Sequence, residues 1–235
     1  FYFIVFLVDV PFSLYKQFVI EERHGFNKMT FGLWLTDLAK NAALAGVLVF
    51  PVTYLCLFLI TSRVEIGALW WILLWALVVL LSVSFMIVFP LIIAPIFNKF
   101  SPIENGLLKE RLEKLLARCK FKSKGLFTMD GSRRSSHGNA YFAGIGGAKR
   151  IVLFDTLIEK LNEKEIEAVL AHEVGHYKCG HIPSRLIQSA LMSLGFFFFL
   201  GLFIDEQLFF LSFGISIETM NLIENSGVLS ALFFI

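Results

Sequence analysis

Long uncharged runs interrupt the chain at three places. No Lys, Arg, Asp or Glu occurs from Asn41 to Ser62, from Ile66 to Asn98, or from Leu186 to Ile204. A helix needs about 20 apolar residues to cross roughly 30 Å of hydrocarbon, and each run reaches that length. Core helices of water-soluble proteins normally keep a polar face, which these runs lack. The pattern therefore predicts membrane-spanning helices at 41–60, 67–95 and 186–204.

Both ends of the sequence are apolar as well. The chain opens with FYFIVFLVDV, without an initiator Met, and closes with GVLSALFFI. These stretches are typical of further membrane helices, including a partial span at residues 1–10. We therefore expect a piece of a longer protein, truncated at both ends. No basic segment precedes the first apolar run, which argues against a secretory signal peptide.

Positive charge is distributed unevenly across the predicted membrane. If the chain passes through the spans in order, residues 12–40 and 98–185 share one side and residues 61–66 lie on the other. Of the 21 Lys and Arg residues, only Arg63 falls in the 61–66 loop. Because cytoplasmic loops carry such an excess of Lys and Arg, we expect a multi-pass integral membrane protein with residues 98–185 in the cytoplasm. The membrane would be the endoplasmic reticulum of a eukaryote or the inner membrane of a bacterium.

Composition indicates the lipid bilayer as a partner and gives no sign of nucleic acid. The chain is 57% hydrophobic, against about 45–50% for soluble proteins. Its net charge of +2 and the short basic stretch SRRSSH give no reason to expect nucleic-acid binding. Three scattered cysteines indicate no disulfide framework: Cys56, Cys119 and Cys179.

The segment at 98–185 combines helical and strand patterns. Apolar residues at helical spacing predict a helix through Leu108, Leu112, Leu115, Leu116 and Cys119. Short β-like segments bounded by Gly and Ser follow at 125–130, 139–144 and 150–155, with a hairpin turn expected at 145–150. A second helix is expected near Asn162, which forms a capping-box-like pair with Glu165. Ile166, Val169 and Leu170 supply the apolar face of this helix.

Two histidines and a glutamate occur in the middle of this second helix, within AVLAHEVGHYKCGH (168–181). At about 100° per residue, His172 and His176 project from one face, one turn apart. Two imidazoles at this spacing can share one tetrahedral zinc ion, each nitrogen at roughly 2.0–2.1 Å. Glu173 points to the open side of the metal, where it can act as a general base on water. The preceding apolar residues are expected to bury this site; the alternative is a pair of hydrogen-bonded core histidines.

Two nearby side chains are alternatives for the remaining chemistry. His181 follows His172 by nine residues, so a continuous helix would turn it away from the metal. Cys179 lies near the histidine face and is a candidate third ligand, although catalytic zinc sites of this kind usually take a carboxylate from elsewhere.

Several segments together resemble the integral-membrane CAAX prenyl protease type I family of zinc metalloproteases. They are PFSLYKQFVIEERHGFNKMT (11–30), APIFNKFSPI (94–103), DGSRRSSHGNAYFAGIGGAKRIVLFDTLIEKL (130–161) and AHEVGHYKCGH (171–181). The resemblance implies a mainly α fold, a multi-span helical barrel with a small α+β cytosolic protease domain. It implies transmembrane spans at 1–97, the protease domain at 98–185 and further spans at 186–235.

The resemblance also implies the site and the reaction. His172 and His176 would bind one Zn²⁺ and Glu173 would be the base, while the third ligand, a glutamate of a later helix, is expected beyond residue 235. The product would be a prenylated protein or peptide that has lost its C-terminal tripeptide. Because metalloproteases commonly hold substrate as an added strand, we expect Asn139, Ala140, Tyr141 and Phe142 to bind it, unless they form an ordinary core strand.

Two other functions compete with prenyl-protein cleavage. A membrane quality-control protease of the heat-shock type has the same zinc chemistry with general peptide substrates. A membrane scaffold with a relic zinc helix would need no intact catalytic residues, yet His172, Glu173 and His176 are all present. The segments outside the zinc helix match the prenyl protease better than the quality-control protease.

Overall fold

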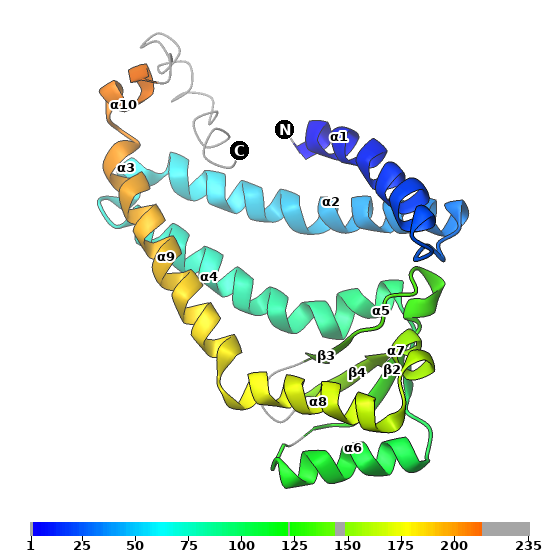
Figure 1. The fold of residues 1–235 in the computed structure, drawn as a ribbon. Helices are drawn as coiled ribbons and strands as arrows, with labels where there is room; N and C mark the ends of the chain where they lie inside the picture. The colour runs from blue at the N-terminus through cyan, green and yellow to red at the C-terminus, as the bar shows by residue number, and fades with distance from the viewer. Residues whose placement is uncertain (1, 122, 144–148, 213–235) are drawn as a thin grey trace. The chain divides into compact units, whose positions relative to one another are not determined.

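The computed structural model describes residues 2–121, 123–143 and 149–212. Most of these residues are helical, and four short strands between Phe100 and Phe154 form a small sheet (Figure 1). The described residues divide into two compact units. One contains 2–6, 38–82 and 185–212, and the other contains 7–37 together with the described part of 83–184.

Three stretches of helix are long and apolar enough to cross a membrane. They are α2 (Phe31–Thr61), the run of α4 (Trp70–Val88), η2 (Phe89–Ile93) and α5 (Ala94–Phe97), and α9 (His181–Phe203). At most 11% of the most apolar window of each is buried, so their side chains mostly face outward, as lipid contact requires. The three predicted spans are confirmed as helices. The first begins ten residues earlier than predicted, the second is shifted by two or three residues toward the C-terminus, and the third begins five residues earlier. The chain is an integral membrane protein.

The N-terminal stretch is also helical. Helix α1 (Tyr2–Tyr15) leads into the π-helix η1 (Lys16–Glu21). The apolar C-terminal stretch GVLSALFFI lies outside the described residues.

The first unit packs parts of α2, α4 and α9 around a small apolar core. Its fully buried members include Cys56, Leu74 and Ile204. Beside this core lie α3 (Arg63–Ile66) and α10 (Gln207–Ser212). Arg63 forms a 2.9 Å ion pair with Asp205 at the end of α9. Beside this core the Trp75 indole N–H donates a hydrogen bond to the Ala190 carbonyl of α9 at 2.9 Å, so that apolar packing and this bond together hold the three helices.

The second unit is built on a four-stranded sheet of order β1-β2-β4-β3. The strands are β1 (Phe100–Pro102), β2 (Leu126–Met129), β3 (Ala140–Ala143) and β4 (Arg150–Phe154). Strands β2 and β4 are parallel, whereas β1–β2 and β3–β4 are antiparallel. The three strands predicted at 125–130, 139–144 and 150–155 are therefore confirmed. The expected hairpin turn at 145–150 falls largely outside the described residues.

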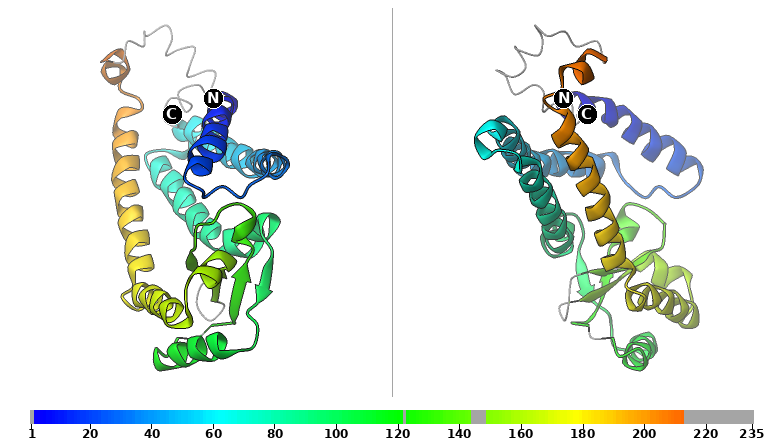
Figure 2. Two further views of the ribbon diagram at one scale, coloured as in Figure 1. Left: turned by 45° about the vertical axis from the view of Figure 1, so that its right-hand side comes forward. Right: turned by 90° about the vertical axis from the view of Figure 1, so that its left-hand side faces the viewer.

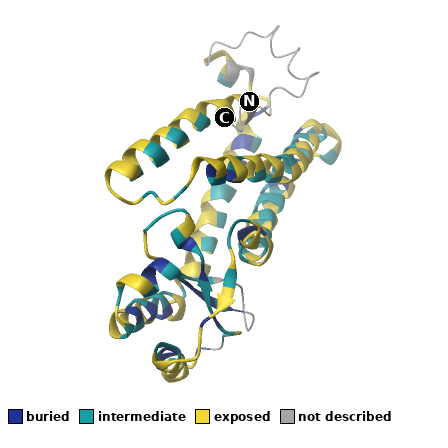
Figure 3. Ribbon diagram, turned by 90° about the vertical axis from the view of Figure 1, so that its right-hand side faces the viewer, coloured by how far each residue is buried: buried dark blue, intermediate teal, exposed yellow. Residues whose placement is uncertain are grey.

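Helices α6 (Leu107–Arg118) and α8 (Glu163–Lys178) pack on each other, and α8 also contacts β3. Leucines of α6, apolar residues of α8 and the inward side chains of β4 form one core, with Leu112, Ile151, Leu153, Ile166 and Leu170 at most 1% exposed. Buried positions accordingly gather on the strands and on one side of these helices (Figure 3). Two short helices, η3 (Gly131–Arg133) and α7 (Asp155–Lys160), complete this unit. The predicted fold class, mainly α with several spans and a small α+β part, is confirmed.

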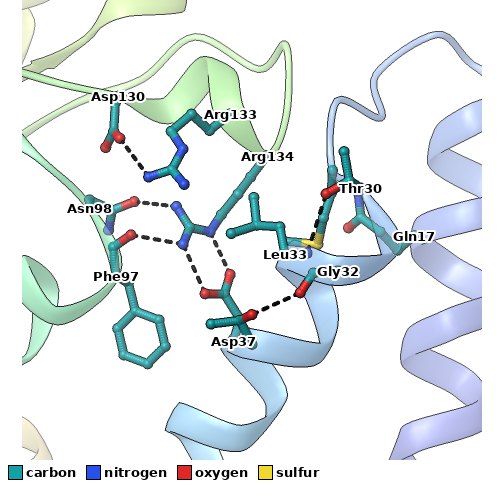
Figure 4. Close-up of polar contacts among 12 residues, drawn as sticks. Gln17, Thr30, Gly32, Leu33, Asp37, Phe97, Asn98, Asp130, Arg133 and Arg134 are labelled. Atoms are coloured by element: carbon teal, nitrogen blue, oxygen red, sulfur yellow. Dashed lines mark hydrogen bonds and ion pairs between the residues drawn. The ribbon is translucent and has the colours of Figure 1, made fainter.

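A half-buried arginine joins the sheet to the ends of two apolar helices. Arg134 makes a two-pronged ion pair with Asp37 near the start of α2, at 2.7 and 3.0 Å. Its remaining donors reach the Asn98 side chain at 2.9 Å and the carbonyl of Phe97 at 2.8 Å, just after α5 (Figure 4). Asp37 is only 8% exposed. One guanidinium therefore holds α2, α5 and the segment before β3 in a fixed relation.

Because of this joint, replacing Arg134 should destabilise the protein much more than replacing the neighbouring Arg133. Arg134→Ala leaves the Asp37 charge buried and unpaired, which typically costs about 3–5 kcal/mol. Arg133→Ala removes only the 3.2 Å surface pair with Asp130, which is worth about 0–1 kcal/mol. We expect thermal unfolding of the full-length protein in detergent to show a much lower midpoint for Arg134→Ala than for Arg133→Ala. The double variant Asp37→Leu/Arg134→Met should recover much of the loss, and equal effects of the two single variants would contradict this role.

Candidate metal centre

Helix α8 begins with a complete capping box. The Asn162 side chain accepts hydrogen bonds from the backbone of Lys164 and Glu165, at 3.0 and 3.1 Å, and the Glu165 carboxylate accepts one from the Asn162 backbone at 2.8 Å. Such a box satisfies N–H groups that have no partner within the first helical turn. The predicted start of the helix at Asn162 is confirmed, and with it the position of every residue that follows.

The buried and the polar faces of α8 lie on opposite sides. Ile166, Leu170 and Val174 recur every four residues and are each 1% exposed in the core. His172 is about 200° around the axis from Leu170, and it is exposed. The expectation that the preceding apolar residues bury the site is therefore wrong, because those side chains point into the sheet and away from the histidines.

The two predicted ligands meet in the geometry that a metal needs. The Nε2 atoms of His172 and His176 lie 3.0 Å apart. Two nitrogens bound to one tetrahedral zinc ion at about 2.0–2.1 Å would be roughly 3.3 Å apart, so the pair needs only a slight adjustment. The rings are perpendicular, with centroids 4.6 Å apart. The residues present thus fit a shared metal ion.

Glu173 is placed to act on water beside this pair. It is half-buried and lies closer to the buried stripe than either histidine. Within the described part of the chain its carboxylate has neither a hydrogen-bond nor an ion-pair partner. It is therefore free to accept a proton.

No third candidate ligand is grouped with the histidine pair among the described residues. Among residues 2–121, 123–143 and 149–212, no three His, Cys, Asp or Glu side chains are grouped to hold a metal. Cys179 caps the C-terminus of α8 and is exposed. It does not join the histidine pair.

The prediction that a continuous helix carries His181 away is wrong. Helix α8 ends at Lys178 and α9 begins at His181, a break that Figure 2 shows. Gly180 turns the chain with φ of +66°. His181 then lies against His176, with 2.7 Å between their Nδ1 atoms, on the side of the ring opposite His172.

Strand β3 is an edge of the sheet, as the substrate role requires. Ala140 is buried, and Phe142 packs on the same core. Tyr141 points to the other face, where its ring meets Phe154 edge-on at 6.2 Å. The side chains of Ala140, Tyr141 and Phe142 therefore alternate between the two faces of the sheet. Burial raises the pKa of the Tyr141 hydroxyl, which keeps it neutral.

The free edge of β3 offers peptide groups at alternate residues. The Phe154 N–H donates to the Asn139 carbonyl at 2.9 Å, so Asn139 and, two residues on, Tyr141 direct their peptide groups toward β4. By the alternation of an antiparallel ladder, Ala140 and Phe142 direct theirs outward. The Ala140 N–H is held by the Asn139 side chain at 2.8 Å.

An aromatic cluster, missed at the level of sequence, joins the end of α8 to β3. The Tyr177 ring meets Phe121 edge-on at 4.9 Å, and Phe121 meets Phe142 at 5.0 Å. The buried Lys149 ammonium bonds to the Tyr177 hydroxyl and lies 5.1 Å from the centre of the Phe121 ring. Tyr177 directly follows His176, so this cluster fixes the turn that carries the second histidine.

The polar stretch 21–28 packs beside the segment that leads into β3. Asn27 forms a β-bridge with Ser135, and the Phe26 ring stacks on His137 at 4.1 Å. Glu21 accepts a 3.2 Å contact from His137. The stretch is a structural support for the edge strand. No periodicity in either segment signals this pairing, because it joins residues more than 100 positions apart.

Comparisons with known proteins agree with this site. Residues 1–99 match the family description "CAAX prenyl protease N-terminal, five membrane helices", and residues 102–234 match "Peptidase family M48". CAAX prenyl protease 1 homolog of Arabidopsis thaliana is 45% identical over 188 residues, covering 80% of this chain and 44% of that protein. CAAX prenyl protease 1 of Saccharomyces cerevisiae is 43% identical over 213 residues, covering 90% and 46%.

A human relative and a solved structure extend the likeness. The human CAAX prenyl protease 1 homolog is 34% identical over 245 residues, covering 88% of this chain and 51% of that protein. The crystal structure of S. mikatae Ste24p has a TM-score of 0.81 and 40% identity, covering 88% of this chain and 48% of that one. The chain thus spans about half the length of the relatives it matches. The match over residues 102–234 covers more than half of the chain and includes His172, Glu173 and His176. The chain therefore belongs to peptidase family M48.

Proposed function

We propose that this chain carries the metal-binding helix of a zinc metalloendopeptidase that removes the C-terminal tripeptide from prenylated CAAX proteins. The 3.0 Å approach of the His172 and His176 Nε2 atoms carries this proposal, together with a Glu173 carboxylate on the same helix that has no partner among the described residues. The substrate class rests on relatives named CAAX prenyl protease 1. Because the chain spans about half the length of these relatives, the activity of the whole protein is part of this proposal.

Each chemical role falls to a residue of α8. His172 and His176 would hold zinc, together with a third ligand from outside the described residues. When bound, zinc polarises a peptide carbonyl and lowers the pKa of a water toward about 7. Glu173 would take a proton from that water while the water oxygen attacks the carbonyl carbon. The same carboxyl then gives the proton to the leaving amine, so that the peptide bond is cleaved with no net change in Glu173.

The substrate would lie along β3. Asn139, Ala140, Tyr141 and Phe142 form the strand to which an extended peptide would add, through the outward peptide groups of Phe142 and the Ala140 carbonyl. The aromatic cluster of Tyr177, Phe121 and Phe142 links this strand to the histidine turn. A peptide on β3 would therefore be held relative to the metal by the protein core.

The cellular setting follows from charge and from the relatives. We assign residues 98–185 to the cytoplasmic side, because they and residues 12–40 contain 20 of the 21 Lys and Arg residues. Eukaryotic relatives favour the endoplasmic reticulum membrane. Besides its prenylated substrate, the protein has the lipid bilayer as its partner.

The base is tested by separating metal content from turnover. Glu173→Gln should keep zinc and lower turnover about 10²–10⁴-fold, since an amide cannot accept the proton. Glu167→Gln is a matched control on the same helix, because Glu167 only pairs with Arg111 at 3.2 Å, and it should cleave normally. Zinc content and cleavage of a farnesylated CAAX peptide are measured on the full-length protein. Normal turnover by zinc-loaded Glu173→Gln would reject the assigned role.

The substrate class has its own comparison. The same peptide without the farnesyl group should be cleaved much more slowly by the wild-type protein. Equal rates with and without the lipid would instead favour a general quality-control peptidase.

Strand addition predicts a period of two in the substrate. Replacing one backbone amide at a time by an ester in a farnesylated peptide removes one N–H donor. Each lost bond to β3 is worth about 0.5–1.5 kcal/mol, so KM should rise several-fold at alternate positions only. A uniform rise along the peptide would contradict addition to an edge strand.

Topology is tested by labelling single cysteines. In full-length protein from which Cys56, Cys119 and Cys179 have been removed, Lys164→Cys should react only with a reagent applied from the cytoplasm. Glu65→Cys, in the short loop, should react only from the opposite side. Both positions are exposed, so a lack of labelling would not come from burial. Labelling of both from one side would overturn the assigned orientation.

A further inference from the structure

The two ring nitrogens of His176 have different neighbours. Its Nε2 lies 3.0 Å from His172 Nε2, whereas its Nδ1 lies 2.7 Å from His181 Nδ1. The rings of His176 and His181 are tilted by 56°, with centroids 4.9 Å apart. His176 is therefore held between two histidines, one on each side of its ring.

The break between α8 and α9 creates this contact. Five residues of uninterrupted helix would turn His181 by about 140° from His176. Instead, the Cys179 N–H bonds to the Gly175 carbonyl at 2.9 Å, and the Gly180 N–H bonds to the Tyr177 carbonyl at 3.1 Å. A Cβ on Gly180 would meet nothing within 4 Å, so glycine is needed there for its φ of +66° and not for space. The turn at Gly180 therefore places the His181 side chain against His176.

Hydrogen-bond chemistry gives this pair one consistent arrangement. Metal binding at Nε2 uses the lone pair of that nitrogen, so a neutral His176 carries its proton on Nδ1. The Nδ1–H then donates to the lone pair of His181 Nδ1, and His181 carries its own proton on Nε2. Such a partner fixes the tautomer and orientation of a ligating histidine and makes it a better donor to the metal.

We propose that His181 is a positioning residue, the hydrogen-bond acceptor that orients His176 for metal binding. This rests on the proposed zinc site at His172 and His176. His181 itself is no ligand of that site, because it lies on the Nδ1 side of His176, away from the point that the two Nε2 atoms share.

Two substitutions of nearly equal shape separate hydrogen bonding from packing. His181→Asn keeps an acceptor oxygen near the place of Nδ1, and His181→Leu replaces it by a methyl group. We expect zinc affinity of the full-length protein, measured by competition with a chelator, to fall about 10–100-fold in His181→Leu. His181→Asn should restore most of that loss. Cys179→Ser, on the same turn, should bind zinc as the wild type does.

Each other outcome decides against the proposal. Wild-type affinity in His181→Leu would show that the contact has no effect on the metal. An equal loss in His181→Asn and His181→Leu would mean that the imidazole itself is required, as for a ligand. His172→Ala and His176→Ala serve as references for loss of the site. If these two variants bind zinc normally, the proposed metal site is wrong, whereas their loss with a normal His181→Leu rejects only the positioning role.

Discussion

The orientation of α8 about its own axis is the constraint on which the candidate site depends. Ile166, Leu170 and Val174 are each 1% exposed, and burying such a side chain contributes about 1.5–3 kcal/mol. Rotating the helix by one residue, about 100°, would lift this stripe from the sheet. The direction of His172 and His176 is therefore set by residues that lie on the opposite face and take no part in the chemistry. A carboxylate next to the first histidine comes to lie between the two faces, half-buried and unpaired within the described chain.

Both ends of α8 are fixed as well, each by a different kind of interaction. The capping box fixes the start at Asn162. At the other end, Lys149 and Phe121 hold Tyr177, and Gly180 reverses the chain so that His181 meets His176. The same Phe121 ring contacts Phe142 of the edge strand. Because the histidine turn and β3 share this apolar cluster, a small shift of one would displace the other, which suits a site that must align a peptide with a metal.

Local signals in the sequence were sufficient for most of these elements. The apolar runs, the three strands, the capping box at Asn162 and the one-turn spacing of the histidines each depend on neighbours within a few residues, and each is confirmed. Helical periodicity misplaces His181, because the helix ends before Gly180. A glycine followed by a new apolar run is a signal for such an end. The pairing of Asn27 with Ser135 and the role of Arg134 could not be predicted, since contacts across about 100 residues leave no periodic pattern. His172 is exposed, contrary to expectation, because the apolar residues next to it in sequence lie on the opposite face of α8.

Under the proposed function the substrate is part lipid and part peptide, and the polar joint at Arg134 connects the parts of one unit that would suit each. A peptide strand needs a sheet edge in water, whereas a prenyl chain needs apolar surroundings, and burial contributes about 0.8 kcal/mol per CH₂. Arg134 leads into the segment before β3, and its partners Asp37, Phe97 and Asn98 lie at the ends of two apolar helices. A lysine could not make these four bonds at once, because only a guanidinium has a planar fork of five donors. The charge, which would be costly inside a bilayer, thus lies at the ends of these apolar helices, where it holds the segment that leads into the edge strand.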